Sequence, residues 1–296
     1  MVKPLQHKLW RDVRRHRAQF IAITLTMFLG VTIFGATYDS FQNLTASYET
    51  TATEYRFANL TVAGGDVETF AQVAAMEPGV ESAELRTSID VPFRVDGTKL
   101  LGRAIGLPAD DQPAVNQIEV LTGIYLDPTS PDGVLVEQHM ADHFGLRPGS
   151  TMEVHDGTVW REMMVVGTIA SPEYIWTARD RQNIITTPDN FGVIFAAEPT
   201  VRELAATGPN EVVTYYAAGV ENEELTTSLS ATARSLGATN VYTRAEQASN
   251  AALEEDLAGF EEMAIFFPIM FLLAARMAAY VMISRLVHAQ RPHIGV

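Results

Sequence analysis

Two long apolar stretches, one near each end of the chain, dominate the pattern of hydrophobic and polar positions. Residues 18–38 contain no charged side chain, and residues 263–284 contain only one, Arg276. A helix rises about 1.5 Å per residue, so about 20 residues cross the roughly 30 Å hydrocarbon core of a bilayer. The sequence therefore predicts two membrane-spanning helices.

Each stretch has an alternative interpretation. For the first it is a signal peptide, whose apolar core has roughly 7–15 residues and ends at a small-x-small cleavage site. Here the run is longer, and Phe34 stands where a small residue would have to precede Ala36. For the second it is a buried helix of a soluble domain, but such helices seldom stay apolar on all sides for about 20 residues. We favour an uncleaved anchor followed by a second span.

The charged residues indicate the orientation of the two spans. Six Lys or Arg residues and one Asp lie in residues 1–17, and three Arg and no acid lie in residues 263–296, whereas the whole chain has a formal net charge of −15. The positive-inside rule places both termini in the cytoplasm and residues 39–262 outside the cell membrane. An acidic middle argues against nucleic acid as a partner. The absence of cysteine excludes disulfides, thiolate metal sites and cysteine nucleophiles.

Helical spacing extends beyond both spans. Residues 1–17 combine apolar positions, Trp10 among them, with basic ones, which is typical of a helix on the inner leaflet in contact with lipid. The alternative is a disordered basic tail. The spacing continues outward from the first span through Tyr48, and Thr243 and Glu246 form a capping box before the second. We expect two helical stalks, with ordinary surface helices of the outer domain as the alternative.

Between the stalks, strand and helix patterns alternate. Asp96-Gly97 and Asp156-Gly157 each separate two alternating runs, which is the signal of a β-hairpin. The predicted strands cover residues 59–63, 87–95, 100–107, 133–136, 151–155, 159–168, 183–186, 212–218 and 240–242, and the predicted helices cover residues 66–76, 137–144, 200–206 and 221–236. Because α/β units occur at both ends and strands dominate residues 85–195, we predict a mixed α/β base with an inserted β-rich lobe.

The fold class that follows is a membrane α plus α/β protein, in which two transmembrane helices with stalk extensions flank an extracytoplasmic mixed α/β domain. We divide the chain into a cytoplasmic amphipathic helix (1–17), a transmembrane helix with its stalk (18–57), the extracytoplasmic domain (58–242), a second stalk and transmembrane helix (243–284), and the start of a cytoplasmic segment (285–296).

Motifs for catalysis and metal binding are weak or absent. The sequence contains no phosphate-binding loop, no nucleophile elbow and no H-E-x-x-H zinc motif. His139 and His143 stand four residues apart on a predicted helix, but a zinc site needs a third ligand, so two solvated histidines are the preferred interpretation. We therefore assign no catalytic, cofactor-binding or metal-binding residue.

Arg276 is the anomalous residue of the second span. An ionised side chain at the centre of a span costs roughly 2.5–3.5 kcal/mol on insertion scales, and by default it indicates a function with a partner facing it. Neither span contains an acid, so the partner would be another chain, another helix or lipid headgroups. The alternative is a side chain that extends to the membrane interface.

The end of the chain, SRLVHAQRPHIGV from Ser284 to Val296, carries the most specific pattern. It resembles the segment after the second span of FtsX-like permeases, the MacB and lipoprotein-release type of ABC transporter subunit, which typically reads R-x-V-x-x-Q-R-x-x-I-G. The stretch VLVEQHMADHFGLRPGSTMEV also resembles a strand-helix-strand unit of that family's outer domain, and the layout of the spans agrees. The matching positions of the terminal motif are Arg285, Val287, Gln290, Arg291, Ile294 and Gly295.

The resemblance implies a porter-like α/β lobe in the outer domain and a separate ABC ATPase as partner. It also implies a homodimer or a paired permease, with ATP hydrolysed by the ATPase alone. Two features depart from the family: His293 stands where an acid is common, and the family continues with further spans after I-G, so we expect the sequence to be part of a longer protein. The residues implied to begin the ATPase-coupling segment are Arg285, Gln290, Arg291, Ile294 and Gly295.

Two classes of function remain open on the sequence. The leading hypothesis is a non-enzymatic permease subunit that extrudes or extracts a hydrophobic or lipidated substrate, or transmits force to an outer partner. The alternative is a two-span sensor or scaffold whose outer domain binds a ligand or a cell-wall enzyme. A membrane-tethered enzyme is disfavoured because no catalytic constellation is present.

Overall fold

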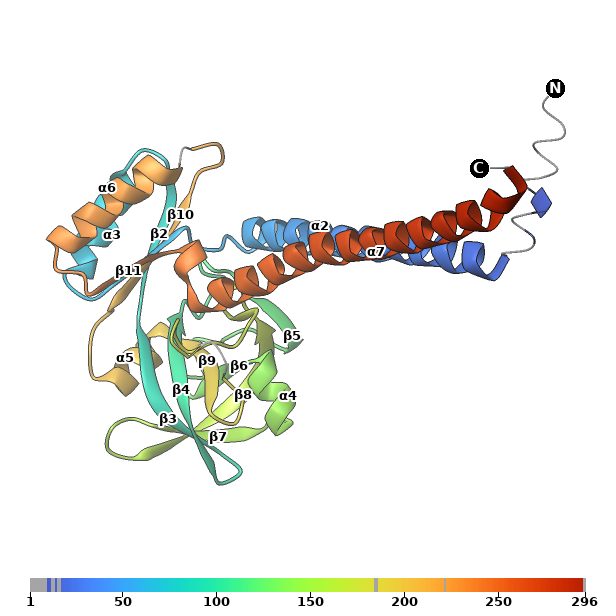
Figure 1. Ribbon diagram of the computed structural model, residues 1–296. Coiled ribbons are helices and arrows are strands. Elements are labelled where there is room, and N and C mark those ends of the chain that lie inside the picture. Colours follow the sequence, from blue (N-terminus) through green and yellow to red (C-terminus); the bar gives the residue numbers. More distant parts are fainter. Residues whose placement is uncertain (1–9, 12–13, 15–16, 184–185, 221, 295–296) are drawn as a thin grey trace. The chain divides into compact units, whose positions relative to one another are not determined.

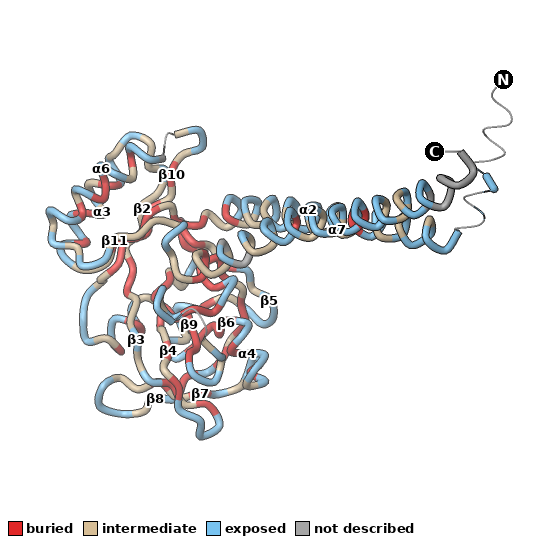
Figure 2. The backbone as a smooth tube through the Cα atoms, viewed as in Figure 1, coloured by how far each residue is buried: buried red, intermediate tan, exposed pale blue. Residues whose placement is uncertain are grey.

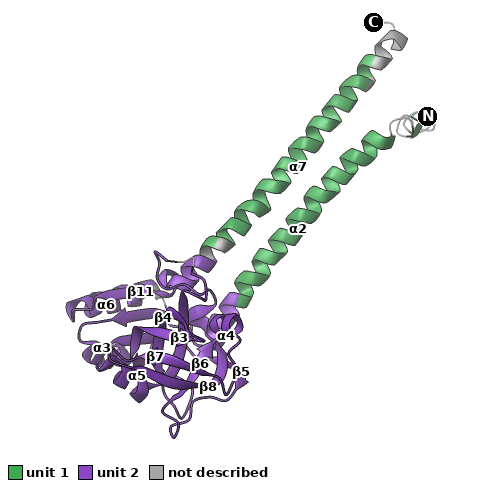
Figure 3. Cartoon of the chain, turned by 90° about the horizontal axis from the view of Figure 1, so that it is seen from below, with its two compact units in different colours: residues 1–47, 255–296 green, residues 48–254 purple. Residues whose placement is uncertain are grey.

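The computed structural model describes residues 10–294 except 12–13, 15–16, 184–185 and 221 (Figure 1). The chain divides into two compact units, which are coloured separately in Figure 3. The first unit contains residues 1–47 and 255–296, and the second contains residues 48–254. Figure 2 shows that buried residues are concentrated in the second unit, whereas most of the first unit is exposed.

The first unit consists mainly of two long helices, α2 (Arg17–Glu54) and α7 (Ala248–Ile294), each of which continues into the second unit. Both are long and apolar enough to cross a membrane, which confirms the two predicted candidate spans. The helices lie side by side where Gly30 meets Phe271, and a Cβ atom added at Gly30 would lie 2.9 Å from the Cβ of Phe271. Glycine at this position therefore permits the close approach. The predicted N-terminal helix lies largely outside the described residues; of its positions, Trp10, Arg11 and Arg14 are helical.

The start of α7 differs from the predicted stalk. The expected capping box is present, with the amide of Thr243 donating to Glu246 Oε2 at 3.0 Å, but it closes the short 3₁₀ turn η2 (Arg244–Glu246). The backbone is extended at Gln247, with a ψ of 136°, so the turn does not continue into the long helix. The helix α7 begins only at Ala248.

A four-stranded antiparallel sheet forms what we call the base lobe of the second unit. Its strand order, β11-β1-β10-β2, brings together strands from both ends of the outer domain. Asp66 begins the helix α3 by accepting a hydrogen bond from the amide of Thr69, as the sequence predicts. Leu60, Val62 and Phe70 are buried between the sheet and its helices. The elements are β1 (Leu60–Ala63), α3 (Val67–Met76), β2 (Val80–Arg86), β10 (Glu211–Tyr216), α6 (Asn222–Ser235) and β11 (Asn240–Thr243).

The chain between β2 and β10 forms a barrel lobe, which is the predicted β-rich insertion. Its sheet has the order β5-β8-β6-β9-β4-β3-β7, and an additional pairing of β7 with β8 closes six of the strands into a ring. The strand β5 pairs with the remainder of β8 outside this ring. The elements are β3 (Ser88–Val95), β4 (Thr98–Leu107), β5 (Glu119–Gly123), β6 (Gly133–Glu137), α4 (Gln138–Phe144), β7 (Thr151–His155), β8 (Trp160–Ala170), the 3₁₀ turn η1 (Pro172–Tyr174), β9 (Phe191–Ala197) and α5 (Glu198–Ala205).

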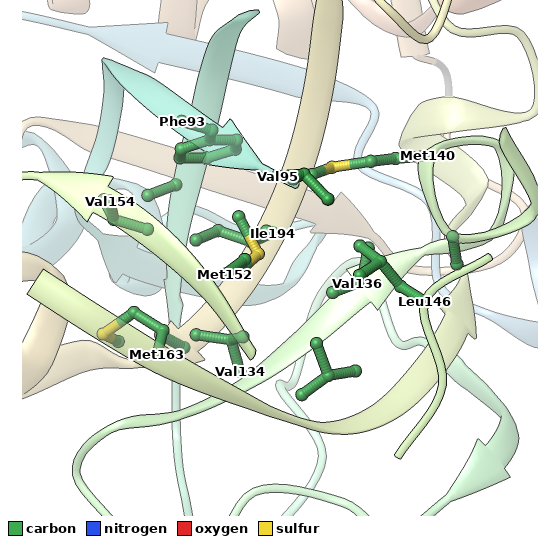
Figure 4. Close-up of a cluster of buried hydrophobic side chains, with 14 of the residues drawn as sticks. Phe93, Val95, Val134, Val136, Met140, Leu146, Met152, Val154, Met163 and Ile194 are labelled. Carbon is green, nitrogen blue, oxygen red and sulfur yellow. The ribbon is translucent and has the colours of Figure 1, made fainter. Parts of the chain in front are cut away.

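The interior of the ring is a packed apolar core (Figure 4). Alternate residues of β3, β6, β7 and β8 point inward, as the period of two in a strand requires. The ring of Phe93 lies against Gly102, where a Cβ atom would overlap it. The expected hairpin at Asp96-Gly97 is present, and both residues have the positive φ that a type I′ turn needs, 47° and 83°. This core makes the barrel lobe a rigid body.

The sequence patterns missed three strands, β2, β5 and β9, and misjudged one. The strand expected at residues 183–186 falls partly outside the described residues, and Asn183 takes part only in an isolated bridge with Asp180. The side chain of Asp180 accepts hydrogen bonds from the amide and the side chain of Asn183, so a local turn holds this segment.

Candidate functional site at the bases of the two long helices

The loop between β4 and β5 binds the backbone of the two residues that follow α2. Their carbonyl groups lie beyond the last turn of the helix, and the loop supplies hydrogen-bond donors for them. The amide of Asn116 donates to the carbonyl of Arg56 at 3.0 Å, and the amide of Gln117 donates to that of Tyr55 at 2.8 Å. In return, Asn116 Oδ1 accepts the amide of Ala58 at 2.7 Å. Residues 55–58 are therefore fixed to the barrel lobe.

Arg56 connects the same point to the base lobe. Its Nη1 donates to Glu81 Oε1 at 2.7 Å and its Nη2 to Ser82 Oγ at 2.8 Å, both on β2. Its Nε donates to the carbonyl of Ala114 at 2.7 Å, in the loop of the barrel lobe. The guanidinium also lies over the ring of Tyr215, 4.8 Å from its centroid. One side chain at the end of α2 thus contacts both lobes.

The base of α7 is attached to the barrel lobe and to the residues that follow α2. Gln247 Nε2 donates to the carbonyl of Glu173 in η1 at 2.7 Å, and the amide of Trp176 donates to Ser249 Oγ at 2.8 Å. Arg244, just before α7, donates to the carbonyls of Phe57 and Ala58. We call this set of residues the junction; it comprises residues 55–58, 114–117, 172–176 and 244–249, all in the second unit.

A buried ion cluster lies next to the junction and joins the two lobes. Arg86, at the end of β2, makes a two-pronged contact with Glu173, at 2.7 Å (Nη1–Oε2) and 2.6 Å (Nη2–Oε1). Its Nε contacts Glu211 Oε2 at 2.7 Å. The three side chains are 6%, 6% and 9% exposed, so water contributes little to their solvation. Tyr242 adds a hydrogen bond to Glu211 Oε1 at 3.3 Å.

The opposite charges in this cluster stabilise one another in their ionised forms. Burial alone would lower the pKa of Arg86, but the carboxylates of Glu173 and Glu211 outweigh burial and hold its pKa well above the ordinary value. Burial raises the pKa of Tyr242 well above its ordinary value, and burial raises the pKa of Tyr174 to about 12. Both phenols are therefore neutral at physiological pH, and Arg86 stays ionised.

A cavity of about 620 Å³ lies beside the ion cluster, between the two lobes. It is lined by residues of both lobes and by Gln247 and Ala248 at the start of α7. Its walls carry charges of both signs, and Arg103 in the wall makes a two-pronged contact with Asp90 at 2.7 and 3.1 Å. Most wall charges are thus paired within the wall.

The structure places the sequence-predicted site residues that it describes in α7. Arg285 is exposed near its end, and the backbone of Gln290, Arg291 and Ile294 is helical. The side chains of these three residues, and Gly295 altogether, lie outside the described residues. Arg276 is exposed in the middle of the apolar part of α7. The junction and the ion cluster were not among the predicted sites.

The histidines of α4 have local partners. His139 Nδ1 lies 2.7 Å from Glu137 Oε1, and the ring of His143 packs edge-on against Phe144 at a centroid distance of 4.7 Å. In the part of the chain that the structure describes, no group of three or more His, Cys, Asp or Glu side chains gathers as a metal site would require.

We expect the His139–Glu137 contact to make stability depend on pH. The hydrogen bond to Glu137, whose side chain is 2% exposed, raises the pKa of His139 despite its partial burial. A raised folded-state pKa contributes stability below the unfolded value of about 6.5, and that contribution is lost as pH rises through the folded value. Because His139 is 46% exposed, the contribution should stay below about 1 kcal/mol. Urea unfolding of wild type and His139→Gln at pH 5.5 and 9 measures it: the difference between them should be larger at pH 5.5, and an equal difference at both contradicts the assignment.

Comparison with known proteins gives a limited result. No family model and no curated protein sequence matches the chain. Solved structures do match. The periplasmic region of MacB from Actinobacillus actinomycetemcomitans is 12% identical over 67% of this chain and 91% of its own, with a TM-score of 0.40. The extracellular domain of the noncanonic ABC-type transporter YknZ from Gram-positive bacteria is 10% identical over 63% of this chain and 98% of its own, with a TM-score of 0.41.

The first is a periplasmic region and the second an extracellular domain of its protein. The TM-scores lie below 0.5 and the identities below 25%, so no function of MacB or YknZ transfers to this chain on this likeness. The function proposed below is supported by residues of the chain itself.

Proposed function

We propose that this chain is the permease subunit of an ABC transporter of the mechanotransmission type. It lies in the cell membrane with both termini in the cytoplasm, and a separate ATPase hydrolyses ATP. The chain itself carries no catalytic role. Its partners are the ATPase, membrane lipid and a second permease chain, either a copy or a paired subunit. Movement of the long helices would drive extrusion or extraction of a hydrophobic or lipidated substrate, or act on an outer partner.

The junction is the observation that supports this proposal best. A helix that only anchors a domain needs no bonded connection to the folded core. Here the base of α2 is bonded to both lobes, and the base of α7 is bonded to the barrel lobe and to residues 57–58 after α2. Gln247 links α7 to η1, and Glu173 of η1 links onward to Arg86 of the base lobe. A displacement of α7 along its axis would therefore move η1 and load the ion cluster between the lobes.

The cytoplasmic end of α7 supplies the other half of the proposal. The helix runs without a break from Ala248 to Ile294, so it continues into the segment that resembles the ATPase-docking sequence. The 47 residues of α7 correspond to a length of roughly 70 Å. Arg285, Gln290, Arg291, Ile294 and Gly295 are the residues to which we assign ATPase coupling.

The docking assignment can be tested by reversing charge and apolarity in the motif. The double variant Arg291→Asp and Ile294→Asp should reduce co-purification of the partner ABC ATPase on the order of tenfold relative to the wild type, because a docking anchor and a basic contact are both lost. The matched control is His288→Asp, an exposed α7 position at a variable place of the motif, which should leave association unchanged. Undiminished association of the double variant would remove the docking assignment.

One observation favours the alternative of a two-span sensor. The inter-lobe cavity of about 620 Å³ is large enough for a small ligand, and residues at the start of α7 line it. A ligand bound in the cavity would therefore contact that helix. A sensor of this kind would function without an ATPase. Wild-type activity in a strain that lacks the gene of the partner ATPase would therefore favour the sensor over the permease.

A further inference from the structure

An exposed stripe runs along the membrane part of α7. Its members recur at spacings of three and four residues, so they share one face of the helix. The side of α7 that packs against α2 lies about 120° round the helix from the stripe, with Ala264 and Ala275 buried and Phe271 against Gly30. Each apolar member of the stripe is more than half exposed, and Arg276 stands in its middle; the apolar members are Ile265, Ile269, Leu272, Tyr280, Ile283 and Val287.

Arg276 has no counter-charge within reach. The side chain makes no ion pair or hydrogen bond among the described residues, and the nearest acid on its own helix, Glu262, is 14 positions away, roughly 21 Å along the axis. The part of α2 that packs beside it, residues 18–38, contains no acid. Lipid chains are a sufficient environment for apolar side chains, but an ionised guanidinium at the same depth needs a polar or charged partner.

Extension of the Arg276 side chain to the membrane interface does not replace the missing counter-charge. Arg276 is nearer to the C-terminal end of the span, since Arg285 is nine positions on, roughly 13 Å along the axis. Side chains of an α-helix, however, lean toward its N-terminus, which is the more distant end here. The direction of the side chain therefore opposes the shorter route to water.

A second copy of the chain does not supply what is missing. Two copies that met through this stripe would bring Arg276 near Arg276, and like charges in a low-dielectric medium repel. Neither span of a copy contributes an Asp or Glu, because residues 18–38 and 263–285 contain none. The occupant must bring a negative charge at mid-membrane depth from outside residues 1–296.

We propose that the α7 stripe is the docking face for a transmembrane helix that carries an Asp or Glu near its midpoint, with the carboxylate paired to Arg276. The apolar stripe residues give packing along the length of the contact, and the ion pair fixes its depth and selects the partner. A pair of this kind is favourable in the membrane because each ion is desolvated already in its own helix. The proposal rests on α7 crossing the membrane, as the proposed function requires.

The test uses the full chain in phosphatidylcholine vesicles and synthetic transmembrane helices as probes. The chain has no cysteine, so His288→Cys gives a single site for a fluorescent donor on α7, away from the stripe. The probes are leucine-based helices of about 22 residues with an acceptor dye and with Glu, Gln or Leu at the midpoint. Energy transfer as a function of probe density gives the association constant of each helix.

The Glu helix should associate on the order of tenfold more tightly than the Leu helix, and the Gln helix should fall between them. Arg276→Leu should remove the preference for Glu, whereas Arg276→Lys should retain part of it. A matched change on the same helix away from the stripe, Met277→Leu, should leave the preference intact. Equal binding of the Glu and Leu helices by the wild type, or an unchanged preference in Arg276→Leu, overturns the proposal.

A control for sidedness distinguishes the absence of a Glu preference from the case in which α7 does not cross the membrane. In sealed vesicles a cysteine at position 288 and one at Ser130, in the outer domain, should react with a membrane-impermeant thiol reagent from opposite sides. If both react from the same side, α7 does not span the bilayer, and the proposed topology fails together with the docking face. If they react from opposite sides and the Glu preference is absent, only the docking face fails.

Discussion

Arg86→Met should destabilise the outer domain by about 3–5 kcal/mol, the usual cost of removing one partner from a buried ion pair. Methionine fills much of the volume of the arginine side chain, but it leaves the carboxylates of Glu173 and Glu211 buried without a cation. Urea unfolding of the full chain in detergent, followed by tryptophan fluorescence, measures the loss; Trp160 and Trp176 report on the barrel lobe and the junction.

Two comparisons show whether the buried charge is the cause. Arg161→Met removes an arginine whose partners, Asp132 and Glu203, are 54% and 71% exposed, and it should cost below about 1 kcal/mol. Adding Glu173→Gln and Glu211→Gln to Arg86→Met should recover much of the loss, because the uncompensated charges are gone. A triple variant that recovers none of the loss would point to packing instead.

Asn116→Ala should release the base of α2 and cost about 2–4 kcal/mol. Asn116 is 1% exposed, its Oδ1 accepts the amide of buried Ala58, and its φ of 57° is unfavourable for alanine. The variant therefore leaves a buried N–H without an acceptor and adds backbone strain. Urea unfolding gives the total, and hydrogen exchange of the Ala58 amide, which should become faster, locates the effect.

Two further variants divide this cost between its causes. Asn116→Gly loses the acceptor but removes the strain, so it should cost roughly 1–2 kcal/mol less than Asn116→Ala. Asp96→Ala, at an exposed turn with a φ of 47°, introduces the same strain without a buried hydrogen bond, so it should cost about 1–2 kcal/mol and leave exchange at Ala58 unchanged. Identical costs for the Ala and Gly variants at position 116 would show that strain plays no part.

The features that follow from local chemistry were predictable. Two runs of about 20 apolar residues have few alternatives to a membrane span. Asp96-Gly97 predicts a hairpin because two consecutive residues with positive φ suit few other dipeptides. In the hairpin at Asp156-Gly157 only the glycine has a positive φ, 95°, and the loop has four residues. Asp66 predicted the start of α3 because a side-chain oxygen can accept an orphan amide of the first turn.

The missed strands have patterns that sequence periodicity does not identify. In β9 all seven residues are buried, so the run lacks the alternation of a strand with one wet face. In β2, VESAELR, most residues are half-buried, and in β5 most are exposed, so neither shows an apolar face. These strands form because neighbouring strands already present a free edge, which is a tertiary effect.

The ion cluster could not be predicted for a related reason. Arg86, Glu173 and Glu211 lie 87 and 38 residues apart along the chain, and only the packing of two lobes brings them together. The sequence feature that comes nearest to indicating the cluster is a charged residue at the end of a strand. It does not identify a buried site, because such residues more often face solvent. The exposed stripe of α7 was also hidden, because lipid-facing and helix-facing apolar residues look alike until α2 is in place. The predicted domain boundaries and the ATPase-coupling residues remain predictions.

The closed ring of the barrel lobe has a consequence for crowding on the membrane surface. Sheets aggregate through strands whose amide and carbonyl groups lack a neighbour, and a ring has none. Among the described strands of this lobe, only β5 has an open side, and it is five residues long and begins with an exposed glutamate. If permease chains pair, two outer domains stand close together in one plane. A barrel lobe with so short an open edge lets such neighbours remain separate while the helices beneath them move.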